Sequence, residues 1–133
     1  MPSVSVHNQA RLMDSFFLTY YSVSSLIGMF MGFTLALYLL TARDGSAAMR
    51  HIGITILCAG MLNVAYFISS TFYDPLAAYH RWLTVPFGLA MAIHPVHLYL
   101  HYPTNRWPRI TRILLIVQYL GLILSAGLFF TAS

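Results

Sequence analysis

The stretch from Tyr79 to Pro103 constrains this chain more than any other. It is mostly apolar and long enough to cross a bilayer, since a helical span needs ~20 such residues. Three histidines inside it follow an i, i+3, i+7 spacing and would share one stripe of a helix: His94, His97 and His101. Ionisable side chains are costly in a membrane and by default mark functional sites. We therefore expect this span to lie at the centre of a helical bundle.

Two prolines, Pro86 and Pro95, interrupt the same stretch. Each lacks a backbone N–H and frees the carbonyl group four residues earlier, at Trp82 and Met91. In hydrocarbon a free carbonyl needs another partner, so the helix should face protein rather than lipid at these places. We expect both prolines to act in helix packing, and Pro95 to bend the helix.

Composition indicates a membrane protein. Of the 133 residues, 59% are hydrophobic and 8% are charged, and the mean hydropathy is +0.71. The net charge of +4 comes from a few arginines beside the apolar runs, without a basic face or a nucleic-acid-binding motif. We expect no nucleic-acid partner. The single cysteine, Cys58, lies in an apolar run and is expected to be a small buried hydrophobe.

Four apolar runs follow a polar leader at residues 1–15. The predicted membrane spans cover about residues 16–41, 47–72, 79–102 and 110–131. Because the connecting loops are short, consecutive spans must be antiparallel neighbours. The predicted fold is all-α: an integral membrane four-helix antiparallel bundle over residues 16–132.

The first two spans contain candidate contact residues. Gly28 and Gly32 form a small-xxx-small pattern that lets another helix approach closely. Asn63 and Tyr66 are the buried polar features of the second span. We expect Asn63 to form an interhelical hydrogen bond, and we keep both polar residues as candidates for packing or for ligand contact.

Arginines predict the orientation of the spans. Five of the seven lie in or beside the first and third loops: Arg43, Arg50, Arg106, Arg109 and Arg112. The leader and the second loop hold only Arg11 and Arg81. The positive-inside rule therefore places the first and third loops in the cytoplasm and both termini outside it. We expect a multi-pass protein of the bacterial cytoplasmic membrane.

This topology brings a fourth histidine close to the stripe. His51 opens the second span on the side where His97 and His101 close the third, with His94 one turn deeper. Imidazole suits Zn, Cu, Ni and Fe, and histidines on two facing helices can also hold a haem. A proton-responsive cluster is an alternative, since histidine titrates near physiological pH. Another is that the outer histidines are simply solvated at the headgroups.

Enzymatic motifs are missing from the sequence. It contains no HExxH, no Gly-rich phosphate loop and no spacing that indicates a Ser/His/Asp triad. The run His94–His101 stands without the further histidine boxes of membrane desaturases. We expect no catalytic activity from this chain itself.

Several segments resemble the N-terminal sensor regions of bacterial, particularly spirochaete-type, signalling proteins: Asn63–Ile68, Phe72–Trp82, His101–Pro103 and Pro108–Arg109. Such regions have about seven spans, followed by an adenylate or guanylate cyclase, a phosphatase of the sporulation-regulator type or a histidine kinase. The resemblance implies a sensor whose catalytic output domain is absent here, with only the first four spans present. It supplies no catalytic residues for this part of the chain.

The sequence therefore predicts a membrane input, sensor or assembly module. Its helices would shift about Pro86 and Pro95 when a ligand, lipid or proton alters the polar interior. A small accessory subunit of a membrane complex is the alternative, binding haem or metal through the histidines. A scaffold without a ligand is a third. Beside the lipid bilayer, the expected partners are other membrane subunits or further copies of this chain.

Overall fold

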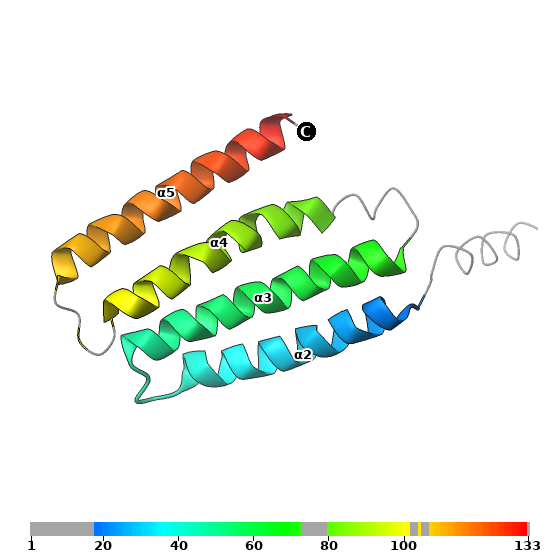
Figure 1. Ribbon diagram of the computed structural model, residues 1–133, viewed down its shortest axis with the longest axis horizontal. Helices are drawn as coiled ribbons and strands as arrows, with labels where there is room; N and C mark the ends of the chain where they lie inside the picture. Colours follow the sequence, from blue (N-terminus) through cyan, green and yellow to red (C-terminus); the bar gives the residue numbers. More distant parts are fainter. Residues whose placement is uncertain (1–17, 73–79, 102–103, 105–106, 133) are drawn as a thin grey trace, which may run out of the picture.

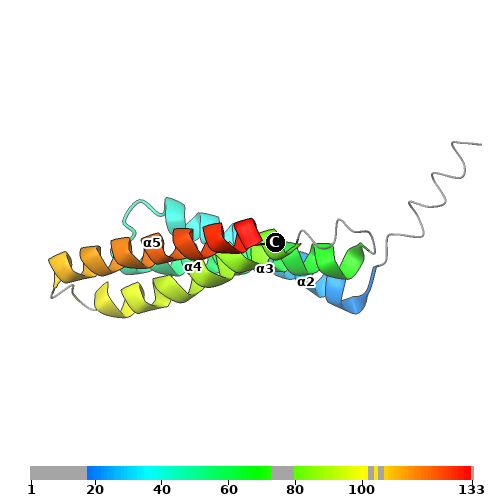
Figure 2. The same ribbon diagram turned by 90° about the horizontal axis from the view of Figure 1, so that it is seen from above.

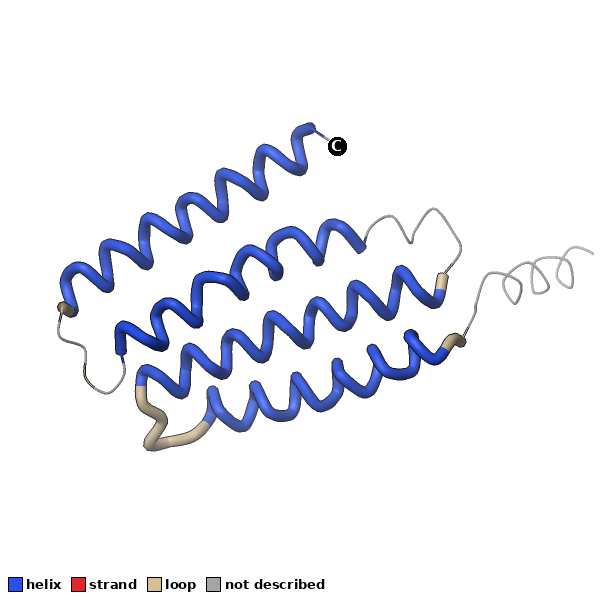
Figure 3. Tube along the Cα trace, in the orientation of Figure 1, coloured by secondary structure: helices blue, strands red, loops and turns tan. Residues whose placement is uncertain are grey.

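The computed structural model describes residues 18–72, 80–101, 104 and 107–132, which form four helices joined by short connections (Figures 1 and 3). The helices are α2 (Tyr20–Thr41), α3 (Ala47–Thr71), α4 (His80–His101) and α5 (Pro108–Ala132). Each is long and apolar enough to cross a membrane. Even 22 residues of helix span about 33 Å, slightly more than the hydrocarbon core. The predicted all-α membrane fold is confirmed, while the leader at residues 1–15 lies outside the described residues.

The four helices lie side by side in chain order and alternate in direction (Figure 1). α2 packs on α3, α3 on α4, and α4 on α5, with no contact between other pairs of these described helices. Figure 2 views the row from its α5 side, where the helices overlap one another. The bundle is therefore open, with α2 and α5 at its edges. The start of α3, the end of α4 and the start of α5 share one end of it (Figure 1).

Local sequence signals set the starts of three helices. Thr19 and Ser22 form a capping box, in which each side chain bonds the other residue's backbone N–H. The Ser46 side chain accepts a hydrogen bond from the Met49 backbone N–H at the start of α3. Pro108 opens α5, at a position where its missing N–H costs little. The caps satisfy backbone N–H groups at the starts of α2 and α3, and Pro108 removes one such group from the start of α5.

Glycines make the contact between α2 and α3 close. A Cβ added to Gly32 would lie 3.2 Å from the Gly60 Cα, so backbone meets backbone there. A Cβ added to Gly28 would lie 3.0 Å from Oδ1 of Asn63. The small-xxx-small pattern of α2 thus lies in the contact with α3, where small residues allow dense packing.

Asn63 does not form the predicted interhelical hydrogen bond; its side chain bonds within its own helix instead. Its Nδ2 donates to the Ala59 carbonyl oxygen, one turn earlier on the same helix, at 3.0 Å. Its oxygen meanwhile packs against the bare surface of Gly28. The glycine offers no side-chain partner, so the amide satisfies its donor within α3. Tyr66 points out of the bundle and is 54% exposed.

α5 is the least covered helix. Thr111 and Ala126 are its only buried side chains among those described. Near the end of the row opposite the histidines, the ring of Phe130 stacks on Trp82 of α4, with a centroid distance of 4.3 Å. α5 therefore depends on a small number of specific contacts with α4.

Candidate functional site

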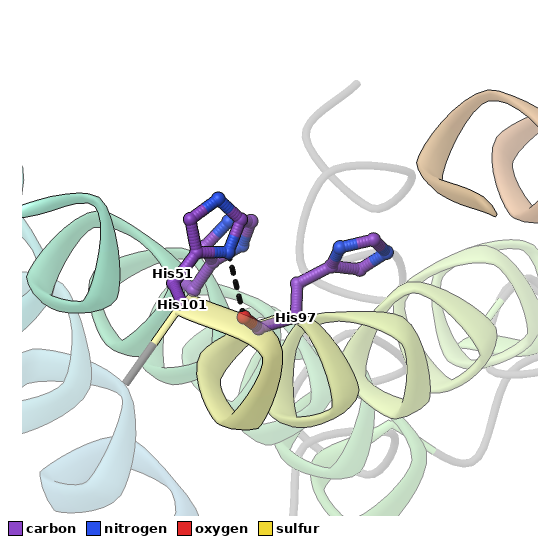
Figure 4. Close-up of side chains that lie close together, drawn as sticks. All are labelled: His51, His97 and His101. Carbon is purple, nitrogen blue, oxygen red and sulfur yellow. Dashed lines mark hydrogen bonds between the residues drawn. The ribbon is translucent and has the colours of Figure 1, made fainter. Parts of the chain in front are cut away.

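Four histidine side chains meet at one end of the helix row. His51 lies near the start of α3, and His94, His97 and His101 lie in the last turns of α4 (Figure 4 shows three of them). The His51 ring centroid is 5.4 Å from those of His94 and His97, and 4.9 Å from that of His101. His94 and His97 are buried, with 2% and 0% exposure, and the other two are partly covered. Pro95 lies between the two buried histidines.

A chain of hydrogen bonds crosses three helices through His94. Its Nδ1 lies 3.1 Å from Nδ1 of His51 on α3. Its Nε2 lies 2.7 Å from the hydroxyl of Tyr119 on α5. Because this imidazole is almost fully buried, both of its nitrogens need a partner, and the two neighbouring helices provide them.

His97 forms a second link between α4 and α5. Its Nε2 lies 2.7 Å from Oε1 of Gln118. Its other nitrogen, Nδ1, is buried and has no hydrogen-bond partner among the described residues. The main-chain carbonyl of His97 accepts a hydrogen bond from Nδ1 of His101 at 2.8 Å. Every histidine of the cluster is therefore oriented by at least one polar contact.

The other predicted site residues lie apart from this cluster. Asn63 follows His51 by twelve residues on the same helix, about 18 Å along its axis. Tyr66 lies farther along and faces outward. Gly28 and Gly32 belong to the α2–α3 contact. Pro86 lies in α4, eight residues before His94.

Gln118 and Tyr119 were not among the predicted site residues, although both contact the cluster. They are the largest uncharged polar side chains of the predicted fourth span, and this is the sequence signal that could have identified them. Polar groups in a membrane helix seek partners on neighbouring helices. The buried histidines of α4 are the partners that these two residues find.

The cluster offers imidazole nitrogen atoms as metal ligands. Among the described residues, a metal-sized group of donors is formed by His51, His97 and His101, whose ligand atoms lie within 4.8 Å of one another. A bis-histidine haem needs two imidazoles pointing edge-on at an iron from opposite faces of the macrocycle. The His51 and His97 rings instead stack with an interplanar angle of 21°. The geometry suits a single ion better than a haem.

The chain matches no protein-family model, and comparisons with curated proteins and with solved structures return no match either. Its function is therefore inferred from its own residues. Among these residues the buried histidines are the strongest candidates, because ionisable side chains within membrane helices are rare and by default mark functional sites.

Proposed function

We propose that this chain is the membrane-embedded input module of a bacterial signalling protein and has no catalytic activity of its own. The observation that carries the proposal is the attachment of α5. This edge helix has few buried side chains, yet it is hydrogen-bonded to α4 through two buried histidines. The resemblance to bacterial sensor regions supports the same conclusion.

The hydrogen bonds between α4 and α5 contribute a substantial part of the free energy that holds α5 in place. An interhelical hydrogen bond in a membrane contributes ~0.6–2 kcal/mol. His94–Tyr119 and His97–Gln118 provide two such bonds between α4 and α5. An occupant that reorients these rings would therefore change the docking of α5 by an energy sufficient to shift populations several-fold. The row is open, so α5 can move without displacing α2.

The arginine distribution supports the direction of the signal. The histidine cluster lies at the end of the row that carries Arg43 and Arg109, which the positive-inside rule assigns to the cytoplasm. In this orientation the cluster is near the face where a cyclase, phosphatase or kinase partner operates. The protein itself would be located in the bacterial cytoplasmic membrane.

Spin labels on α4 and α5 test the proposal. Labels at the lipid-facing positions Leu89 and Leu124, with Cys58 replaced by Ala, report the separation of the two helices by pulsed electron paramagnetic resonance. Gln118→Leu and Tyr119→Phe should lengthen or broaden the distance distribution. The control is Thr131→Val, because this α5 hydroxyl bonds only to carbonyls of its own helix. Distances that are the same in all variants would contradict the proposal.

The signalling role itself needs a second measurement in native membranes. Cyclase, phosphatase and kinase activities are compared between cells carrying the original chain, Gln118→Leu and Thr131→Val. Gln118→Leu should change one of these activities, and Thr131→Val should leave it unchanged. Equal activities in all three strains would contradict the signalling role.

The second candidate function is that of an accessory subunit of a membrane complex. The exposed apolar surface of α2 favours it. An open apolar groove of about 660 Å³ runs along α2. Its lining includes Phe30 and Met31, which are 62% and 69% exposed. A transmembrane helix of another subunit would fit such a surface. Photo-crosslinking from Phe30 in native membranes should then give one discrete adduct, whereas crosslinks to lipid alone would exclude this role.

A further inference from the structure

We infer that the histidine cluster binds one divalent transition-metal ion through Nε2 of His51, Nδ1 of His97 and Nε2 of His101. Each of the three residues offers a ring nitrogen that lies within 4.8 Å of one offered by the other two, and the residues come from two helices (Figure 4). The inference names the ligand of the input module, so its consequence for α5 rests on the proposed function. Metal binding itself is measured independently.

The strongest observation is the unpartnered nitrogen of His97. The Gln118 Oε1 can only accept, so Nε2 of His97 carries the proton and donates across 2.7 Å. Nδ1 of the neutral ring is then an unprotonated acceptor. This atom is buried without a partner, in a side chain that has 0% exposure. Buried polar atoms are nearly always paired, and a bound cation would satisfy this one.

His101 is held in the matching tautomer. Its Nδ1 lies 2.8 Å from the His97 carbonyl oxygen, which can only accept a hydrogen bond. Nδ1 of His101 therefore donates, and Nε2 of the neutral ring keeps its lone pair. The contact also fixes the ring beside that of His51, at a centroid distance of 4.9 Å.

One assignment of the protons on His51 and His94 makes His51 the third metal ligand. In the pair of Nδ1 atoms that joins His51 to His94, one nitrogen must donate to the other. When His51 donates, its Nε2 keeps a lone pair, and His94 donates from its own Nε2 to the Tyr119 oxygen. Every polar contact of the cluster is then satisfied, and three lone pairs remain for one ion.

Ligand type narrows the identity of the ion. Three imidazole nitrogens do not suit Mg²⁺ or Ca²⁺, which take oxygen ligands, but they suit Zn²⁺, Cu²⁺ and Ni²⁺. Zn²⁺ has no electronic preference for a geometry, and a three-histidine set leaves its fourth position to water or an anion. Donors bound tetrahedrally to zinc are about 3.3 Å apart, so zinc binding requires side-chain rotations that bring the three rings closer together.

The groups around the ligands connect the ion to α5. Outer hydrogen bonds fix the tautomer and orientation of metal-binding histidines. Here Gln118 holds His97, while Tyr119 holds His94, which in turn holds His51. Metal binding requires the His97 tautomer that Gln118 stabilises and a His94 tautomer that the Tyr119 hydroxyl can accept from. By linkage, an ion at the cluster therefore strengthens the docking of α5 by the same factor as docked α5 strengthens ion binding.

Zinc titration of the purified full chain in lipid nanodiscs tests the site. We expect one Zn²⁺ per chain by elemental analysis and calorimetry. His97→Ala and His101→Ala should each abolish stoichiometric binding, whereas Gln118→Leu should weaken it by about 10–100-fold. The matched control is His80→Ala, which removes a histidine at the opposite end of α4 and should bind zinc like the original chain.

His97→Gln keeps a polar side chain in the core and guards against a folding artefact. Its helicity and elution volume should match those of the original chain while zinc binding is lost. Zinc that does not bind at one equivalent, or that binds equally to His97→Gln, would overturn the inference. The spin-label distances then separate the two proposals. Zinc binding without any response of α5 would contradict the input mechanism alone, and an α5 response in Gln118→Leu without zinc binding would contradict the metal site alone.

Discussion

Nε2 of His97 and Oε1 of Gln118 lie 2.7 Å apart, and this single contact joins α4 to the edge helix α5 while it determines which nitrogen of the ring is free. The two ring nitrogens of His97 thus have different roles. One nitrogen holds a helix, and the other is a buried acceptor without a partner. Predictions about stability and about ligand binding both follow from this arrangement.

Replacing Gln118 by Leu should destabilise the protein. The N–H of the buried His97 would lose its acceptor, and an unsatisfied buried polar group costs about 1–3 kcal/mol. Reversible unfolding in mixed detergent micelles measures the change in the free energy of unfolding. Thr131→Val is the control, because its hydroxyl bonds only within α5. If the two variants prove equally stable, the His97–Gln118 bond does not hold α5.

Replacing Gly32 by Ala should also destabilise the protein. The new methyl group would lie 3.2 Å from the backbone of Gly60, which cannot rotate away. Overpacking of this kind typically costs about 1–3 kcal/mol. Gly121→Ala on α5 is the matched control, because nothing lies within 4 Å of a Cβ at that position. There the better helix propensity of alanine should leave stability unchanged or raise it by up to about 1 kcal/mol. If Gly32→Ala proved more stable than Gly121→Ala, the result would contradict a close backbone contact between α2 and α3.

Zinc affinity should fall as the pH falls. Imidazole binds a metal only in its neutral form, so protons compete with the ion for His51, His97 and His101. The affinity is therefore highest at alkaline pH and decreases by up to about tenfold per pH unit for each proton that zinc displaces. Competition with a zinc-binding dye at several pH values measures the slope. His80→Ala should show the same slope, and an affinity that stays constant into the acidic range where imidazole is protonated would exclude histidine ligands.

Reporter fusions test the orientation. The positive-inside rule predicts that Gly45 and Thr104 lie in the cytoplasm and that the end of α5 lies outside it. A reporter active only in the cytoplasm should therefore work after Gly45 and Thr104, and a reporter active only outside should work after Ala132. The reverse pattern would place the histidine cluster near the outer face and contradict the arginine argument.

Much of this fold was predictable because a bilayer permits few solutions. Apolar runs of this length become spanning helices, and short loops make them antiparallel. The meeting of the histidines was predictable too: their i, i+3, i+7 spacing puts three on one stripe, and His51 begins the helix that runs beside it. Helix geometry and chain direction are enough to bring these four rings to one end.

The partners on α5 were not predictable by the same means. Gln118 and Tyr119 reach the histidines only if α5 is rotated so that they face α4. This helix is apolar on all sides, so no stripe in its sequence indicates which side faces the bundle. Asn63 presents a similar case. Whether its amide bonds within α3 or across to α2 depends on how close the Gly28 backbone lies, and composition does not reveal that distance.

The close approach of Gly32 to Gly60 has a mechanical consequence. The backbones of α2 and α3 meet directly at these two glycines, so we expect the two helices to stay packed together and to move as one unit. No comparable backbone contact was found for the glycines of α5, which meet nothing within 4 Å. We expect displacement to occur instead between α4 and α5, which are joined by the His94–Tyr119 and His97–Gln118 hydrogen bonds.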